Sequence, residues 1–407
     1  MEKKTIRDMD LAGKTVFIRV DFNVPIKSGE IEDDTRIRGA ISTINYAVEH
    51  GAKVVLASHL GRPLKDKKKA DEKGIPFEVS KYSLQPAARR LSELLGKPVD
   101  FERSGNDVAA AIRAMKEGDI LMLENLRLDA GEEMNDYEFA KRLSAGIDIF
   151  VNDAFGTAHR AHASTEGITH YVPHSVAGLL MEKELNFLSQ ALHNPARPFV
   201  AILGGAKVSD KIPVIESLIE RKVDKLLIGG AMAYTFFKAQ GFTVGKSLVE
   251  DDMMPKALEI VELADKAGVE LILPTDHRVV DSYDPLNSAK VIPIAFTNTG
   301  LVGLDIGPET VAIFEAALEG AKTIIWNGPM GMFEEKPFDE GTIAIAEAVA
   351  AATEKGAVSI VGGGDSVSAI NHAGLADKIS HISTGGGATL EFLAGDDLPG
   401  VAALEDK

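Results

Sequence analysis

Residues 199–220, FVAILGGAKVSDKIPVIESLIE, contain the clearest local pattern from which the fold of this chain can be predicted. The apolar start of this stretch, Phe199–Leu203, is typical of a buried strand, and the glycine-rich turn GGAKVSDK follows at Gly204–Lys211. A helical pattern then covers Lys211–Glu220. Glycines in such a turn let backbone amides approach a ligand, and the helix N-terminus presents N–H groups at the positive end of its dipole. The stretch therefore predicts a strand–turn–helix unit with an anion-binding turn.

The same alternation of short apolar strands and helical patterns extends in both directions. In the second half we expect further strands at Lys225–Ile228, Glu270–Leu273, Thr323–Trp326, Val358–Val361 and His381–Ile382, with helices at Met232–Gln240, Met254–Lys266, Glu309–Leu318, Thr342–Ala352 and Val367–Ala373. In the first half we expect strands at Thr15–Val20, Lys53–Ala57, Ile120–Glu124 and Ile147–Asn152, with helices at Ile37–Glu49, Gln85–Leu95, Val108–Lys116 and Tyr137–Ser144. Near-continuous apolar strands between amphipathic helices indicate parallel sheets covered on both faces. The pattern predicts an α/β protein with two doubly wound, Rossmann-like parallel-sheet domains.

The boundary between the two domains falls on a long helical stretch, Leu180–Leu192, which ends in the proline-containing NPARP segment, Asn194–Pro198. Prolines stop a helix, and a helix that joins two domains is a natural hinge. We therefore expect a first domain at 1–180, a hinge helix and linker at 181–197, and a second domain at 198–394, with 395–407 packing back on the first. The basic stretch Lys65–Lys73 is interpreted as a solvated loop.

Composition excludes several functions. The chain has no cysteine, so it has neither a disulfide framework nor a thiolate metal site. Its N-terminus lacks the apolar core of a signal peptide and no apolar run approaches the ~20 residues of a membrane helix, so we expect a cytoplasmic protein. The net charge of −17 argues against a nucleic-acid or anionic-membrane surface. Yet 12 of the 15 arginines precede Pro195, which indicates either a local anion pocket or a drift in composition between the domains.

The polar residues of the first half recur just after predicted strands or at helix starts. They stand in RVDFNVP, DDTRIR, SHLGRP, LENLRL and DAFGTAHRAH, and comprise Asp21, Asn23, Arg36, His59, Arg62, Arg127, His159, Arg160 and His162. One rim of the domain could carry them all, and arginine forks match phosphate and carboxylate oxygens in pairs. For any single arginine, pairing with a nearby acid such as Glu124 or Asp153 is the alternative. We reject a zinc site at the histidines because the neighbouring arginines would repel the ion.

The second half has three more glycine-rich turns: NGPMGMFE at Asn327–Glu334 and GGGDS at Gly362–Ser366 follow strands, and TGGGAT at Thr384–Thr389 opens the last helix. Together with the first turn they favour a nucleotide-phosphate site. The segment GFTVGKS, Gly241–Ser247, resembles a Walker loop, but it is one residue too short and follows a helical stretch. No GxGxxG opens the first unit of either half, which disfavours a dinucleotide-binding dehydrogenase.

These motifs, in this order, closely resemble those of the phosphoglycerate kinase family over essentially the whole chain. The matching stretches are RVDFNVP, SHLGRP, LENLR, NDAFGTAHRAHAS (Asn152–Ser164), GGAKVSDK, GLDIGP (Gly303–Pro308), WNGPMGMFE, GGGDS and STGGGATLE. Ala231 in IGGAMA departs from a glycine that many members carry. The resemblance implies Mg²⁺- and ATP-dependent phosphorylation of 3-phosphoglycerate to 1,3-bisphosphoglycerate, which glycolysis runs toward ATP, by a monomer.

The resemblance also implies roles for individual residues. The first domain would hold the acid: His59, Arg62, Arg127 and Arg160 at its 3-phosphate, Asp21 and Asn23 at its hydroxyl end, and Arg36 at the phosphoryl group in flight. The second would hold the nucleotide: Lys207 and Lys211 at its phosphates, Gly230, Gly303, Asn327, Gly328, Met330 and Glu334 around the nucleoside, Gly363, Gly364, Asp365 and Ser366 capping the phosphates, and Asp365 on Mg²⁺. Amides of Gly364 and Gly387 would help hold the transferring group.

This chemistry suits the residues. Phosphoryl transfer consists mostly of positioning and charge neutralisation, which calls for arginine, lysine and helix N-termini. The acceptor carboxylate is already ionised, so no general base is required. Two other classes remain as alternatives: a non-catalytic two-lobed binding protein, usually exported with a signal peptide, and an α/β oxidoreductase.

Overall fold

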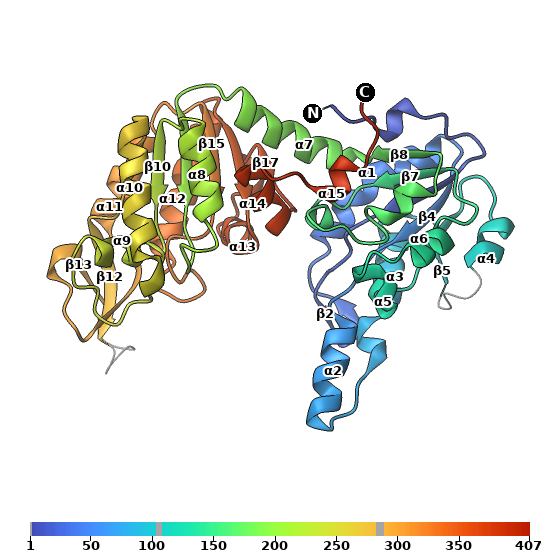
Figure 1. The fold of residues 1–407 in the computed structure, drawn as a ribbon, viewed down its shortest axis with the longest axis horizontal. Coiled ribbons are helices and arrows are strands. Elements are labelled where there is room, and N and C mark those ends of the chain that lie inside the picture. Colours follow the sequence, from blue (N-terminus) through green and yellow to red (C-terminus); the bar gives the residue numbers. More distant parts are fainter. Residues whose placement is uncertain (1, 103–107, 282–288) are drawn as a thin grey trace. The chain divides into compact units, whose positions relative to one another are not determined.

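The computed structural model describes residues 2–102, 108–281 and 289–407 (Figure 1). The chain divides into two compact units. Unit 1 comprises Met1–Asn186 with Asp397–Lys407, and unit 2 comprises Phe187–Asp396. The division lies inside helix α7 (Leu179–His193). Among the described residues, no helix has the length and apolar character that crossing a membrane requires.

Unit 1 is built on a six-stranded parallel sheet with the order β5-β6-β4-β1-β7-β8. Its strands are β1 (Thr15–Arg19), β4 (Lys53–Ala57), β5 (Asp100–Glu102), β6 (Ile120–Leu123), β7 (Ile149–Asn152) and β8 (His174–Ala177), beside the hairpin β2 (Ile26–Lys27) and β3 (Glu30–Ile31). Its helices are α1 (Thr35–Glu49), α2 (Pro63–Lys73), α3 (Gln85–Leu95), α4 (Val108–Ala114), α5 (Ala130–Glu133), α6 (Tyr137–Leu143) and α15 (Pro399–Ala402). The strand order reverses beside β1, which is where doubly wound sheets bind ligands.

The central strand β1 is buried along its whole length, and its side chains alternate between the two faces of the sheet. Val16 and Ile18 join the apolar cluster formed with α1 and α3. Phe17 and Arg19 therefore project to the opposite face, where both are fully buried. Arg19 thus places a charged side chain in the interior of unit 1, directly at the strand end that precedes Asp21.

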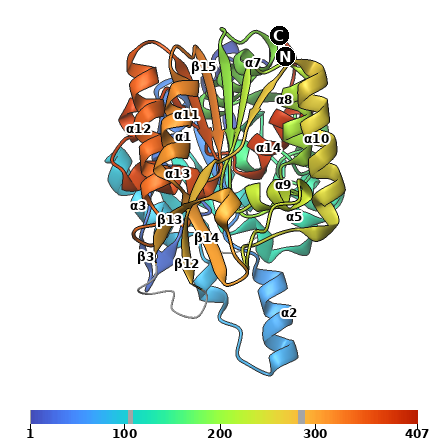
Figure 2. The same ribbon diagram turned by 90° about the vertical axis from the view of Figure 1, so that its left-hand side faces the viewer.

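Unit 2 repeats the architecture with the order β11-β10-β9-β15-β16-β17, again parallel. These strands are β9 (Phe199–Leu203), β10 (Lys225–Ile228), β11 (Glu270–Ile272), β15 (Thr323–Asn327), β16 (Val358–Gly362) and β17 (His381–Ile382). The helices are α8 (Ile212–Glu220), α9 (Ala233–Ala239), α10 (Met254–Ala267), α11 (Pro308–Leu318), α12 (Glu340–Glu354), α13 (Gly364–His372) and α14 (Gly387–Ala394). Figure 2 shows α8, α10 and α14 on one face of this sheet and α11, α12 and α13 on the other. The predicted pair of doubly wound parallel sheets is confirmed.

One predicted loop is wrong, because the basic stretch Lys65–Lys73 belongs to helix α2. Only Pro63 and Ala70 of this helix are buried, so its sequence has no apolar stripe to reveal it. The helix depends instead on good local signals. Pro63 opens its first turn, Gly74 ends it with φ +64°, and most residues between are strong helix formers.

A second departure is a three-stranded antiparallel sheet in unit 2, which the sequence analysis did not predict. It has the order β13-β12-β14, with β12 (Asp276–Asp281) between β13 (Lys290–Pro293) and β14 (Leu301–Ile306). These strands contain charged residues and a glycine, so they lack the apolar runs of the parallel strands. The sheet matters for the site because β14 carries Gly303.

Candidate active site

The polar residues of unit 1 gather at one edge of its sheet. Strands β6, β4, β1 and β7 are neighbours, and the carboxyl ends of parallel strands meet at the same edge. Asp21 and Asn23 follow β1, His59 and Arg62 follow β4, Arg127 follows β6, and Arg160 follows β7, while Arg36 lies in the first turn of α1. We call Arg36, His59, Arg62, Arg127 and Arg160 the basic rim.

A continuous set of hydrogen bonds joins several of these residues. Arg36 donates from NH1 to Asp21 Oδ2 at 3.0 Å and to the carbonyl of Asn23 at 3.2 Å. The amide of Gly61 donates to Asn23 Oδ1 at 2.9 Å, and Arg127 NH1 donates to the carbonyl of Gly61 at 2.9 Å. The structure therefore brings Asp21, Asn23, Arg36 and Arg127 into one network that the backbone of Gly61 completes.

Burial and the arginine charges keep the histidines of this edge neutral. Burial, and then the charges of Arg19, Arg127 and Arg36, hold the pKa of His59 well below its usual value. Burial together with the arginine charges lowers the pKa of His162 to about 4. Near neutral pH the positive charge of the basic rim thus resides on arginines, and the imidazoles contribute N–H donors without charge.

Arg62 and Arg160 differ from the rest of the basic rim because both are exposed. Within the described parts of the chain neither side chain has a hydrogen bond or an ion pair. Arg160 still acts electrostatically on Arg127 and His162. Unneutralised guanidinium groups at a strand-end edge are suited to an anionic ligand.

Glu124 and Asp153, the two acids considered as partners of the arginines, accept hydrogen bonds from other groups. Glu124 accepts hydrogen bonds from the hydroxyl of Ser83 and the amide of Leu84, each at 2.8 Å. Asp153 accepts from the amides of Leu180 and Met181 at the start of α7, at 2.9 and 3.1 Å. Among the described residues neither acid pairs with the basic rim, but the alternative holds with other acids, since Arg36 pairs with Asp21 at 3.0 Å and Arg127 with Glu133 at 3.4 Å.

Sequence reasoning missed a buried polar group behind this edge, consisting of Arg19, Glu132 and Ser164. All three side chains are fully buried. Arg19 Nε donates to Ser164 Oγ at 2.7 Å, and Ser164 Oγ donates to Glu132 Oε1 at 2.6 Å. An arginine that ends a β-branched run was an available signal, but neither of its partners follows from the sequence pattern.

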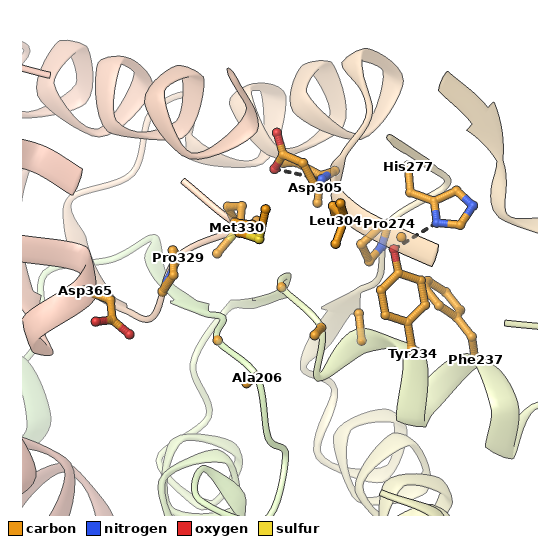
Figure 3. A pocket seen from close by; sticks show the side chains of 18 of the residues that line it. Ala206, Tyr234, Phe237, Pro274, His277, Leu304, Asp305, Pro329, Met330 and Asp365 are labelled. Atoms are coloured by element: carbon orange, nitrogen blue, oxygen red, sulfur yellow. Dashed lines mark hydrogen bonds between the residues drawn. The ribbon is translucent and has the colours of Figure 1, made fainter. Parts of the chain in front are cut away.

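In unit 2 the glycine-rich turns surround a cavity of about 220 Å³ (Figure 3). The turns follow β9, β10, β15 and β16, and β14 closes another side. Of the predicted nucleotide-site residues, those that line the cavity are Gly230, Gly303, Met330, Glu334 and Asp365. Figure 3 shows Asp365 at one end of the cavity and the aromatic rings of Tyr234 and Phe237 at the other.

Two glycines are required where these turns pack together. Gly328 has φ +96°, and a Cβ there would lie 2.1 Å from the carbonyl oxygen of Gly204. Gly230 has φ +68°, and a Cβ there would lie 2.5 Å from the amide nitrogen of Gly205. Both positions combine a left-handed backbone with the close approach of another backbone, so only glycine fits.

The two lysines of the first turn have different surroundings. Lys207 is exposed, whereas Lys211 is buried and donates to Asn327 Oδ1. Burial lowers the pKa of Lys211 to about 8, although the carboxylates of Asp210 and Asp365 favour its charged form. The Nδ2 atom of Asn327 is buried without a hydrogen-bond partner among the described residues. A donor that the protein leaves unsatisfied here is available to a ligand.

The remaining predicted residues of unit 2 lie at the starts of helices. Gly363 precedes α13, which begins at Gly364, and Gly387 begins α14. Ser366 is fully buried, and its hydroxyl accepts from the amide of Gly328 at 2.6 Å, so it fixes the neighbouring turn. Helix starts at Gly364 and Gly387 present free amides and a positive dipole end, which suits phosphate oxygens.

The aromatic end of the cavity was not predicted. Tyr234 and His277 are linked by a 2.9 Å hydrogen bond between the phenol oxygen and Nδ1, drawn dashed in Figure 3. A Cβ on Gly303 would lie 1.7 Å from that phenol oxygen, so the backbone of β14 rests against this pair. Tyr234 lies on α9 and His277 on β12, 43 residues apart. A sequence pattern therefore could not predict their contact.

A basic strand-end edge in one α/β unit and a cavity formed by glycine-rich turns in the other are the features that an α/β phosphotransferase requires. Comparison with known proteins agrees. A family model described as phosphoglycerate kinase matches residues 6–396. The phosphoglycerate kinases of Chloroherpeton thalassium and Thermosipho africanus are each 55% identical over the full length of this chain, which covers 100% and 99% of theirs. A solved structure of phosphoglycerate kinase from Coxiella burnetii superposes with a TM-score of 0.86 at 43% identity and covers 98% of both chains.

This chain belongs to the phosphoglycerate kinase family. It is therefore an enzyme of glycolysis, a phosphotransferase with a carboxyl group as acceptor, and ATP or ADP is its co-substrate.

Proposed function

We propose that the basic rim of unit 1 binds 3-phosphoglycerate and that the cavity of unit 2 binds ADP or ATP, for reversible phosphoryl transfer between ATP and the substrate carboxylate. The supporting observation is the presence of two exposed guanidinium groups, Arg62 and Arg160, without acidic partners among the described residues. A coupled assay for 1,3-bisphosphoglycerate formation with ATP and Mg²⁺ tests it. Binding of both ligands without turnover would instead favour a non-catalytic binding protein.

In this proposal His59, Arg62, Arg127 and Arg160 hold the 3-phosphate of the acid. Asp21 and Asn23 take its hydroxyl end, and Arg36 faces the transferring phosphoryl group. The network that joins Arg36 to Asp21 and Asn23 supports this division, because it holds the groups assigned to the hydroxyl end beside the one assigned to transfer. The acceptor is an ionised carboxylate, so the site needs charge neutralisation rather than a base.

The nucleotide roles follow the cavity of unit 2. Gly230, Gly303, Met330 and Glu334 line the part assigned to the nucleoside, while Asn327 and Gly328 form its turn. Lys207, Lys211 and the residues Gly363, Gly364 and Ser366 take the phosphates, and the amides of Gly364 and Gly387 steady the transferring group. We also propose that the enzyme acts as a cytoplasmic monomer.

We assign the Mg²⁺ ion to Asp365. This carboxylate is exposed, lines the cavity and stands in the first turn of α13. Protein-bound Mg²⁺ is commonly held by one or two carboxylates together with substrate phosphates, so a single carboxylate beside a phosphate site fits the ion. When bound, the ion would neutralise the charge of the nucleotide phosphates.

Replacing Arg62 or Arg160 by alanine should weaken 3-phosphoglycerate binding about tenfold or more, because each variant loses a charged hydrogen bond. ADP binding should be unchanged, since both residues are assigned to the acid alone. Calorimetry with each ligand measures the two affinities. Unchanged 3-phosphoglycerate affinity in either variant would remove that residue from the site.

Nucleotide affinity should depend on pH through Lys211, whose pKa is lowered to about 8 by burial. The phosphates bind the ammonium form, so Lys211 should cause no change in ADP affinity at pH values well below 8. Above pH 8 the affinity should fall, by up to about tenfold per pH unit while Lys211 deprotonates. Lys211→Arg should abolish the fall because the guanidinium stays charged. Lys238→Arg is the control, because Lys238 is an exposed lysine that pairs with Asp251 at 2.7 Å. This variant should still lose ADP affinity above pH 8. If ADP affinity depends on pH in the same way in the native enzyme and in Lys211→Arg, the assignment of Lys211 to the nucleotide phosphates is wrong.

Transfer also predicts a movement about α7. In-line transfer needs the reacting oxygen and phosphorus at roughly 3–3.5 Å, whereas each ligand must first enter and water must then be excluded. We expect the two units to close when both ligands are bound. Because the chain has no cysteine, Glu138→Cys and Glu262→Cys can carry a fluorophore pair, one in each unit. Their separation should shorten most with 3-phosphoglycerate and a non-hydrolysable nucleotide together. The same distance distribution with and without both ligands would rule the closure out.

A further inference from the structure

We propose that Arg19 is a positioning residue of the acid site, which holds His59 as the neutral Nε2–H tautomer and so presents an uncharged donor to the phosphorylated acid. The proposal rests on the placement of the acid at His59 under the proposed function. Arg19 cannot touch the substrate itself, because its side chain is fully buried. Its effect must pass through the groups that it contacts.

The guanidinium of Arg19 is fixed from several sides. Nε donates to Ser164 Oγ at 2.7 Å, and NH1 donates to the carbonyl of Val20 at 2.5 Å. NH2 lies 3.8 Å from Glu132 Oε1 and 3.3 Å from His59 Nδ1. Glu132 is itself held by the amide of Ser164 at 3.0 Å and by its hydroxyl at 2.6 Å. The planar fork therefore has little freedom to turn away from the imidazole.

The direction of the Arg19–His59 hydrogen bond follows from chemistry alone. A guanidinium has only donors, so Nδ1 of His59 must be the acceptor and carries no proton. A neutral imidazole then bears its proton on Nε2, on the side of the ring away from Arg19. Within the described residues Nε2 has no protein partner, which leaves this N–H for a ligand.

One carboxylate competes for the same nitrogen. Asp21 Oδ1 lies 3.8 Å from His59 Nδ1 and would favour a proton there. That distance exceeds a hydrogen bond, and Asp21 is already paired with Arg36 at 3.0 Å. Arg19 is the nearer group, so it sets the tautomer. The nearby groups Arg36, Arg127 and His162 also disfavour a second proton on the His59 ring.

The direct test is the tautomer of His59 in the intact, ligand-free enzyme. Protein labelled with ¹⁵N-histidine gives long-range proton–nitrogen spectra that distinguish Nε2–H, Nδ1–H and the doubly protonated ring. The His59 signals are those missing from His59→Gln. We expect the neutral Nε2–H form at neutral pH. An Nδ1–H form or an imidazolium would overturn the proposal, and would mean that Asp21 controls the ring.

Variants of Arg19 then test whether Arg19 sets the tautomer of His59. Arg19→Gln places an amide near Nδ1 that can accept as well as donate, so His59 should populate both tautomers. KM for 3-phosphoglycerate should rise about tenfold, the effect of one hydrogen bond to a charged group, while kcat changes less. Arg19→Lys keeps a donor and should retain most of the Nε2–H form. Arg38→Lys is the control, because Arg38 is exposed and paired with Asp34 at 2.7 Å. If Arg19→Gln folds and His59 keeps the Nε2–H tautomer alone, the proposal is wrong. If this variant does not fold, the tautomer of His59 in the native enzyme is the deciding measurement.

A double-mutant cycle separates this inference from the proposed function. His59→Gln should weaken 3-phosphoglycerate binding, and adding Arg19→Gln should then cost little more, because Arg19 acts through His59. Additive losses would make Arg19 independent of His59 and overturn the proposal. If His59→Gln binds the acid normally, the placement of the acid fails, and the role of Arg19 in substrate binding fails with it, whatever tautomer the spectra show.

Discussion

Replacing Arg36 by alanine should lower kcat by about 10³-fold or more, the effect of removing an arginine that neutralises a transferring phosphoryl group. Arg36 is the member of the basic rim whose guanidinium is held by Asp21 and by the Asn23 carbonyl. It is thus oriented before substrate arrives, and a preorganised charge contributes most where charge develops. Single-turnover measurements with both substrates saturating report the loss directly.

The matched control lies two residues further along the same helix. Arg38→Ala removes an exposed guanidinium that pairs with Asp34, so it changes the charge of α1 equally without touching the network of Arg36. Arg36→Lys should recover only part of the rate, since an ammonium lacks the planar fork. A kcat for Arg36→Ala within tenfold of the native value would show that Arg36 does not act on the transferring group.

Lys207→Ala should lower kcat by about 10²–10³-fold, the usual cost of losing one preorganised donor to a developing charge. Lys207 is exposed on a turn that is fixed through Glu250, which accepts from the amide and hydroxyl of Ser209 at 3.0 and 2.6 Å. ADP affinity should change much less, because the proposal also assigns Lys211 to the nucleotide phosphates.

Lys238→Ala serves as its control, since it removes an exposed lysine of the same unit that pairs with Asp251. Near-normal single-turnover rates for Lys207→Ala, with both substrates saturating, would exclude Lys207 from the transfer step. A loss confined to ADP binding would instead assign it to the nucleotide alone.

The parallel sheets could be predicted from the sequence because their strands are short, apolar and regularly spaced. Strands such as β4 and β9 begin and end at the residues expected. The same regularity placed the polar residues, since ligand groups of α/β folds follow strand ends. The antiparallel sheet around β12 was missed because its burial comes from tertiary packing of mixed residues rather than from an apolar run. Helix α2 was missed because caps and propensity, not amphipathicity, form it.

Within the candidate site, the residues that stand in strand-end turns were predictable, whereas the groups that support them were not. Arg127 and Lys211 stand in recognisable turns. The partners that orient or modulate the site, such as Glu132 behind Arg19 and His277 behind Tyr234, come from distant elements whose register only the fold sets. Buried hydrogen bonds between residues far apart in sequence leave no periodic trace, so local patterns cannot reveal them.

Unit 1 is discontinuous, and the order of protein synthesis gives this feature a consequence. The last eleven residues close unit 1: Gly400 donates to the carbonyl of Ala158 at 2.8 Å and accepts from Asn152 Nδ2 at 2.9 Å, and Lys3 donates to the carbonyl of Leu404 at 2.8 Å. Domains fold as they emerge from the ribosome, N-terminal first, yet residues 397–407 are synthesised only after the whole of unit 2. The loop that leads to Arg160 therefore gains its last supports only after unit 2 has been made.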